Sequence, residues 1–151
     1  MGQGYLVKCK NCKHEEVVNL GVGMFFPSEY RQLVNRIKDG EYGTEIAEYF
    51  YANPGAVVDA QLELYYCPEC HNHEVDYNLS LYRHKENKEL GKGYWLKWED
   101  DDKEYVFVKA YKHVCSRCGK KMHKIKESEL NNLVCPECGK PVEVSSGLMW
   151  D

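Results

Sequence analysis

The sequence predicts a small, mainly β protein that is stabilised by bound metal ions. Three observations lead to this fold class. All eight cysteines fall into four Cys-x-x-Cys pairs. Short runs of β-branched and aromatic residues flank these pairs and recur between them, which is typical of strands. Only the stretch from about residue 28 to residue 52 has the apolar periodicity of helices. The predicted architecture is therefore two metal-bound β units with one two-helix insertion.

The cysteine pairs are candidate metal ligands because one tight turn presents two thiolates to the same ion. A tetrahedral site needs four soft ligands, so eight cysteines predict two ions per chain. Four protein ligands leave no position for water, and a structural role follows for both ions. Zinc is the expected metal, with iron as the alternative, since both accept four thiolates. The candidate ligands are Cys9, Cys12, Cys67, Cys70, Cys115, Cys118, Cys135 and Cys138.

The spacing of the four pairs favours a sequential grouping. The first and second pairs are separated by 54 residues, the second and third by 44, and the third and fourth by 16. Closing a short loop costs less entropy than closing a long one. The third and fourth pairs are therefore expected to share one site, and the first and second pairs the other. The main alternative is a cross-braced arrangement that joins the first pair to the third.

Residues 111–151 resemble the rubredoxin-like zinc-ribbon class through the motifs CSRCG and CPECG. Gly119 and Gly139 follow the second cysteine of each motif, where the turn often needs a positive φ. The segments YLVKCKNCKHEEVV and YYCPECHNHEV parallel these motifs, with Lys13 and His71 in the glycine positions. The resemblance implies two zinc ribbons, each built from strands on either side of its cysteine pairs.

Residues 1–82 also resemble small bacterial proteins of unassigned function, over the stretch LGVGMFFPSEY. This resemblance implies a bacterial source but does not imply any particular activity. The predicted organisation is an N-terminal ribbon over 1–82, with a helical insertion at about 28–52. Connecting antiparallel strands follow over 83–110, and a C-terminal ribbon over 111–151.

Two helices are expected in the insertion. Ser28 is the expected cap of the first helix, which ends near Lys38, and Thr44 is the expected cap of the second. The dipeptide Asp39-Gly40 ends the first helix, and Asn53-Pro54-Gly55 ends the second. Extended segments are expected at residues 56–66, 78–84, 94–98 and 105–114.

The composition narrows the functions to consider. The formal net charge is −4, which gives no general affinity for nucleic acid phosphates. The first twenty residues lack the apolar core of a secretory signal, and no run of about 18 apolar residues is present. A cytoplasmic location without a membrane partner is therefore expected. Paired cysteines in that reducing compartment favour metal binding over disulfides.

The function expected from these observations is a non-catalytic protein-binding or adaptor module with two structural zinc sites, and no enzymatic activity is expected. Nucleic-acid binding is the first alternative, because no acid lies between Tyr105 and Lys126. A thiol or iron redox protein is the second. Trp95 and Trp98 are candidates for an aromatic partner surface, and packing in the core explains them equally well. The candidate phosphate contacts are Lys120, Lys121, Lys124 and Lys126.

Overall fold

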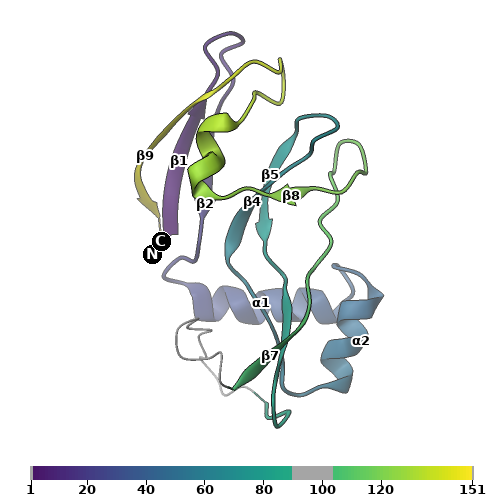
Figure 1. The fold of residues 1–151 in the computed structure, drawn as a ribbon. Coiled ribbons are helices and arrows are strands. Elements are labelled where there is room, and N and C mark those ends of the chain that lie inside the picture. The colour runs from purple at the N-terminus through teal and green to yellow at the C-terminus, as the bar shows by residue number, and fades with distance from the viewer. Residues whose placement is uncertain (1, 90–103, 151) are drawn as a thin grey trace. The chain divides into compact units, whose positions relative to one another are not determined.

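A computed structural model describes residues 2–89 and 104–150, and confirms the mainly β class (Figure 1). Its strands form three antiparallel sheets of three strands each. By their contacts, the residues group into two compact units. Unit 1 comprises Met1–Met24, Gln61–Tyr77 and Lys112–Asp151, and unit 2 comprises Phe25–Ala60 and Asn78–Tyr111. All eight cysteines belong to unit 1, so that unit carries the candidate metal centres.

The first sheet of unit 1 has the order β2-β1-β9. It is formed by β1 (Gly2–Lys8), β2 (Glu15–Leu20) and β9 (Glu143–Trp150). Lys8, at the end of β1, pairs with Glu15 on one side and Glu143 on the other. Figure 1 shows β9 alongside β1, and the pairing runs from Gly2 with Trp150 to Lys8 with Glu143. This pairing places the cysteine pair after β1 beside the cysteine pair before β9.

The second sheet of unit 1 repeats this plan in the order β5-β4-β8. It is formed by β4 (Leu62–Tyr66), β5 (His73–Tyr77) and β8 (His123–Lys124). Tyr66, at the end of β4, pairs with His73 and His123. The cysteine pair after β4 therefore lies beside the pair that precedes β8.

The apolar core of unit 1 contains side chains from both sheets. Val7 and Val18 come from the first sheet, Leu64 comes from the second, and all three are almost completely buried. The short 3₁₀ helix η1 (Glu127–Asn132) adds Leu130 to the same cluster. Burying these side chains supplies an apolar contribution to stability that does not depend on metal.

Unit 2 confirms the helical insertion. Helix α1 spans Phe26–Lys38 and helix α2 spans Thr44–Ala52. Ser28 is not the cap that the sequence suggested: the helix begins two residues earlier, with Pro27 in its first turn, where the missing N–H costs no hydrogen bond. Leu33 and Ile37 form the buried side of α1.

The third sheet also belongs to unit 2, with the order β3-β6-β7. Its strands are β3 (Ala56–Val58), β6 (Leu81–His84) and β7 (Tyr105–Lys109). The extended segment expected at residues 94–98, with Trp95 and Trp98, lies outside the described residues. Within the described part of the chain, neither helix has the length and apolar character needed to span a bilayer.

Candidate metal centres

Each Cys-x-x-Cys pair lies at the tip of a tight hairpin, called a knuckle below, and the four knuckles share one backbone geometry. In each, the N–H of the first cysteine donates to the carbonyl oxygen five residues later, over 2.7–2.8 Å. The residue after the second cysteine donates its N–H back to the carbonyl of the first cysteine, over 2.8–3.0 Å. These two hydrogen bonds fold each pair so that both sulfur atoms can bind one ion.

The knuckles also share a left-handed residue directly after the second cysteine. Gly119 and Gly139 have φ values of 73° and 69°, as their positions in the sequence suggested. Lys13 and His71 adopt the same conformation, with φ values of 65° and 62°. For a residue with a side chain this conformation costs about 1–2 kcal/mol. The left-handed conformation of Lys13 and His71 therefore costs free energy in the first two knuckles. The contacts of the surrounding hairpins must offset this cost.

The eight cysteines form two clusters, in each of which all four sulfur atoms lie within 4.8 Å of one another. Cluster 1 comprises Cys9, Cys12, Cys135 and Cys138, and cluster 2 comprises Cys67, Cys70, Cys115 and Cys118. Sulfur–sulfur distances between opposing knuckles are 3.5 Å in cluster 1, and 3.4 and 3.6 Å in cluster 2. A tetrahedron with metal–sulfur bonds of about 2.3 Å has edges of about 3.8 Å. Both clusters therefore fit a tetrahedral ion.

The grouping of the pairs corrects the sequence-based prediction. The first pair joins the fourth and the second joins the third, so both the sequential grouping and the cross-braced alternative are wrong. The cause is strand pairing. β9 pairs with β1 over its whole length, and β8 pairs with β4, which brings these knuckles together. Because closure entropy rises only slowly with loop length, the short gap of 16 residues was a weak guide.

The four thiols of each cluster differ in exposure. Cys9 and Cys135 are buried in cluster 1, whereas Cys12 is exposed. Cluster 2 repeats this pattern with Cys67 and Cys115 buried and Cys118 exposed. Each cluster therefore has an apolar side within the fold and one ligand open to solvent.

The first effect on thiol acidity is hydrogen bonding from the knuckle backbone. Burial disfavours the thiolate of Cys115, but the backbone N–H groups of Cys118 and Arg117 outweigh it and lower the pKa to about 6. The backbone N–H of Lys140 likewise lowers the pKa of Cys138 to about 6. One thiol in each cluster is thus prepared to lose its proton near neutral pH.

The opposing effect is the crowding of four thiols. The backbone N–H of His14 lowers the pKa of Cys12, but the neighbouring cysteines and burial outweigh it and raise the pKa to about 12. The pKa of Cys118 is also raised to about 12, against the favourable N–H of Lys120. Four like charges cannot gather at this distance without a cation. Each cluster therefore keeps at least one proton at pH 7 until a metal ion binds.

Metal binding is accordingly expected to release at least one proton per ion at pH 7, because crowding raises the pKa of at least one thiol in each cluster. The apparent affinity should fall at least about tenfold for each pH unit below 7, because protons compete for the thiolates. Calorimetric titration in buffers of different ionisation heat measures the released protons. A value near zero would mean that all four thiols are already ionised, and would contradict the crowding argument.

Polar residues link the surroundings of the two clusters. Glu16 on β2 bonds to the buried His73 on β5, and this contact lowers the pKa of the Glu16 carboxyl. Arg117, which lies between the cysteines of the third knuckle, donates to the Pro136 carbonyl of the fourth knuckle over 2.8 Å. The sequence did not predict either contact, because neither follows from a motif or a period.

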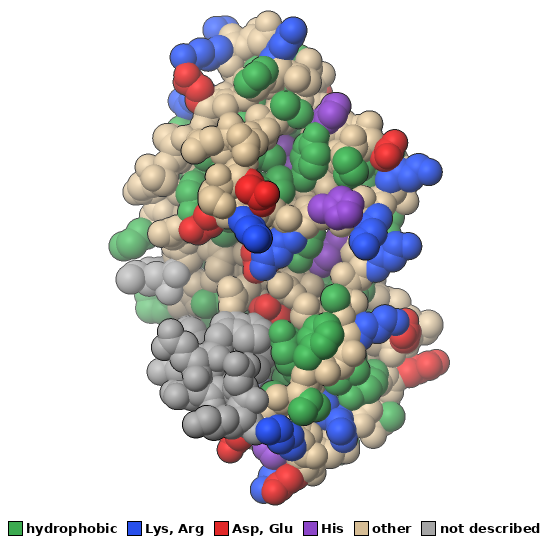
Figure 2. Space-filling view, viewed as in Figure 1, with side chains coloured by type: hydrophobic (Ala, Val, Ile, Leu, Met, Phe, Trp, Pro, Cys, Tyr) green, Lys and Arg blue, Asp and Glu red, His purple; other side chains and the backbone are tan. Residues whose placement is uncertain are grey.

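The lysines that the sequence offered as phosphate contacts are all exposed. Lys124 binds Glu63 over 2.6 Å, so its charge is partly compensated. Lys126 precedes η1, whose first turn carries Glu127 and Glu129. On the face shown in Figure 2, basic side chains lie among acidic ones. Within the basic stretch, Lys109 also pairs with Glu45, and Arg117 pairs with Glu137.

Comparison of the chain with protein-family models, with curated proteins and with solved structures gave no match. The function is therefore inferred from the cysteine clusters and the residues around them.

Proposed function

We propose that the chain is a zinc protein in which each cluster holds one structural ion and supports a three-stranded zinc ribbon. The observation that carries this proposal is the completeness of both clusters. Four cysteine sulfurs surround each centre at distances suited to a tetrahedral ion. Such a site leaves no open position for water or substrate, so the ion stabilises the fold and does not take part in a reaction.

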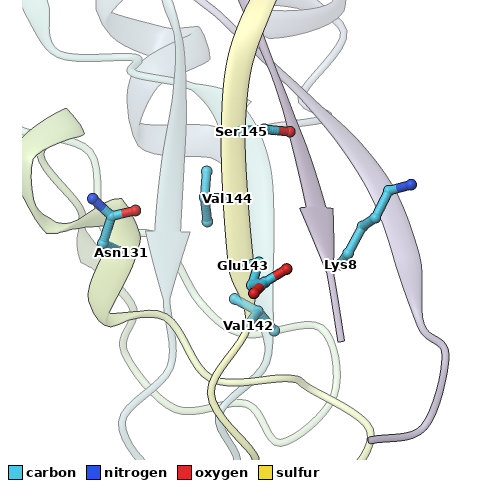
Figure 3. Close-up of a pocket in the computed structure, with 6 residues that line it drawn as sticks. All are labelled: Lys8, Asn131, Val142, Glu143, Val144 and Ser145. Atoms are coloured by element: carbon cyan, nitrogen blue, oxygen red, sulfur yellow. The ribbon is translucent and has the colours of Figure 1, made fainter. Parts of the chain in front are cut away.

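The proposed role of the folded chain is that of a non-catalytic, protein-binding module of the cytoplasm. A hollow of about 420 Å³ lies beside β9 (Figure 3). Figure 3 shows residues 142–145 in succession along the chain, with Lys8 and Asn131 on opposite sides. The two charged groups that line it are engaged elsewhere, since Lys8 binds Glu15 and Glu143 binds Lys10.

The exposed edge of strand β9 favours a protein partner over a nucleic acid. The strand lies at an edge of its sheet, and two of its apolar residues are exposed, Met149 to 72% and Leu148 to 48%. Edge strands with exposed apolar side chains are surfaces that other polypeptides can join. A nucleic-acid surface would instead need a stripe of uncompensated basic groups.

Metal analysis and binding assays test this proposal. The purified chain is expected to carry two zinc ions, to be colourless, and to bind no single-stranded DNA or RNA at low salt. A red, iron-containing protein would overturn the zinc assignment in favour of the redox alternative. Salt-sensitive oligonucleotide binding with a log–log slope near −3, as four phosphate contacts predict, would overturn the partner assignment. In that case, replacing the four lysines by glutamate should abolish binding without releasing metal.

A further inference from the structure

A single carboxylate joins the two knuckles that form cluster 2. Glu74 follows the second knuckle, on β5, and its Oε1 accepts hydrogen bonds from the backbone N–H of Ser116 over 3.0 Å and from the Ser116 hydroxyl. Ser116 lies within the third knuckle, between two ligands of the same cluster. The two halves of cluster 2 are therefore connected by a polar contact that needs no metal.

Asn72 extends this contact to a ligand atom. Its side-chain Nδ2 donates to Glu74 Oε1 over 2.7 Å and lies 3.6 Å from the sulfur of Cys115, within hydrogen-bond reach of sulfur. Asn72 is only 9% exposed. An amide that donates to a thiolate stabilises its charge and fixes its orientation. Asn72, Glu74 and Ser116 are called the cluster 2 bridge below.

Cluster 1 has the same positions but cannot form this bridge. His14 and Glu16 follow the first knuckle at the same spacing as Asn72 and Glu74 follow the second. The residue equivalent to Ser116 is Pro136, which has neither a backbone N–H nor a hydroxyl. Glu16 instead contacts His73 and, over 3.1 Å, His14.

The two clusters also differ in how their sheets align the knuckles. In cluster 1, β9 pairs with β1 from Gly2 to Lys8, so a long ladder sets the position of the fourth knuckle. In cluster 2, β8 pairs with β4 through Lys124 and His123, and one more backbone hydrogen bond runs from the Ile125 N–H to the Leu64 carbonyl over 2.8 Å. This ladder is shorter than the one that aligns cluster 1. The bridge is present at the cluster with the shorter strand ladder.

We infer that Asn72 and Glu74 are positioning residues for the metal of cluster 2, and that they set its affinity and its release rate separately from those of cluster 1. This inference rests on the proposed metal binding at both clusters. Glu74 holds the third knuckle at the correct distance from the second, and Asn72 orients the Cys115 sulfur. Cluster 1 depends on its long strand pairing instead.

The test uses the full chain loaded with ¹¹³Cd²⁺ at both clusters, with each metal signal assigned through single cysteine variants. Excess chelator is added, and the loss of each ¹¹³Cd resonance is followed separately. Glu74→Gln and Glu74→Ala are expected to speed release from cluster 2 by about tenfold or more, with no change at cluster 1. Ser116→Ala, which keeps the backbone N–H, should have a smaller effect of the same kind. Asn72→Ala should also shift the resonance of cluster 2 alone, because it removes a hydrogen bond to a ligand sulfur.

Glu69→Gln is the matched control. Glu69 lies within the second knuckle, so this change removes one negative charge near cluster 2 without touching the bridge. The rate of metal release from cluster 2 in the Glu69→Gln variant should stay within twofold of the rate in the unmodified chain. Equal acceleration at both clusters, a change below twofold in the Glu74 variants, or an equal effect of Glu69→Gln would overturn the inference. Failure of the unmodified chain to bind two ions would instead overturn the proposed function.

Discussion

Replacing Cys135 by serine is expected to release the ion of cluster 1 and to unfold the first sheet of unit 1. Cys135 is fully buried and packs in the core cluster that contains Val7 and Val18. Binding of a structural zinc contributes about 10–16 kcal/mol to small zinc-dependent folds, which is comparable to the whole stability of a domain. The variant should therefore carry one ion, and the amides of β1, β2 and β9 should lose protection in hydrogen exchange.

The matched variant is Cys115→Ser, which removes a buried ligand of cluster 2. It should release the other ion and expose the amides of β4 and β5, with β1 and β2 less affected. The pair of variants separates the nested grouping from a sequential one. If Cys135→Ser exposed residues 112–134 and left β1 and β2 protected, the third and fourth pairs would share a site, contrary to the structure.

The Leu64→Ala substitution is expected to destabilise unit 1 by about 3 kcal/mol without releasing metal from the folded state. Leu64 is on β4 but belongs to the core cluster formed with residues of β1 and β2, and none of its surface is exposed. The cavity would therefore weaken packing around both sheets of unit 1. Denaturant unfolding of the metal-loaded chain measures the change.

Val75→Ala is the control for this substitution, because Val75 pairs with Leu64 in the same sheet but is 37% exposed. Its cost should stay below about 1 kcal/mol. Equal losses in the two variants would mean that the second sheet contributes little to the core, and that strand propensity alone explains the effect of Leu64→Ala.

The sequence predicted the features that local chemistry determines. The Cys-x-x-Cys spacing identified all members of both clusters, since two thiolates on one tight turn have few other uses in such a pattern. The two helices were predicted because Leu33 and Ile37 recur at helical spacing and because Gly40 and Pro54 end the segments. The left-handed turns at Gly119 and Gly139 were also predicted, because glycine at these positions is a local signal.

The features that the sequence did not predict depend on long-range pairing. Which knuckles share an ion is determined by the partners of β1 and β4, and strand partners are not encoded in the spacing of cysteines. The left-handed conformation of Lys13 and His71 is imposed by the hairpins against the preference of these residues. The contact of Glu74 with Ser116 is not predicted by any motif, because the two residues lie far apart along the chain.

The nested order of the pairs has a consequence for synthesis of the chain. Cluster 2 is complete once Cys118 has been made, whereas cluster 1 needs Cys135 and Cys138 to join a knuckle near residue 9. During translation, Cys9 and Cys12 are therefore present without the other two ligands of cluster 1 until the rest of unit 1 has been synthesised. Metal insertion should follow the order of synthesis, with cluster 2 filled first. The ion of cluster 1 then enters last, when β9 closes the first sheet.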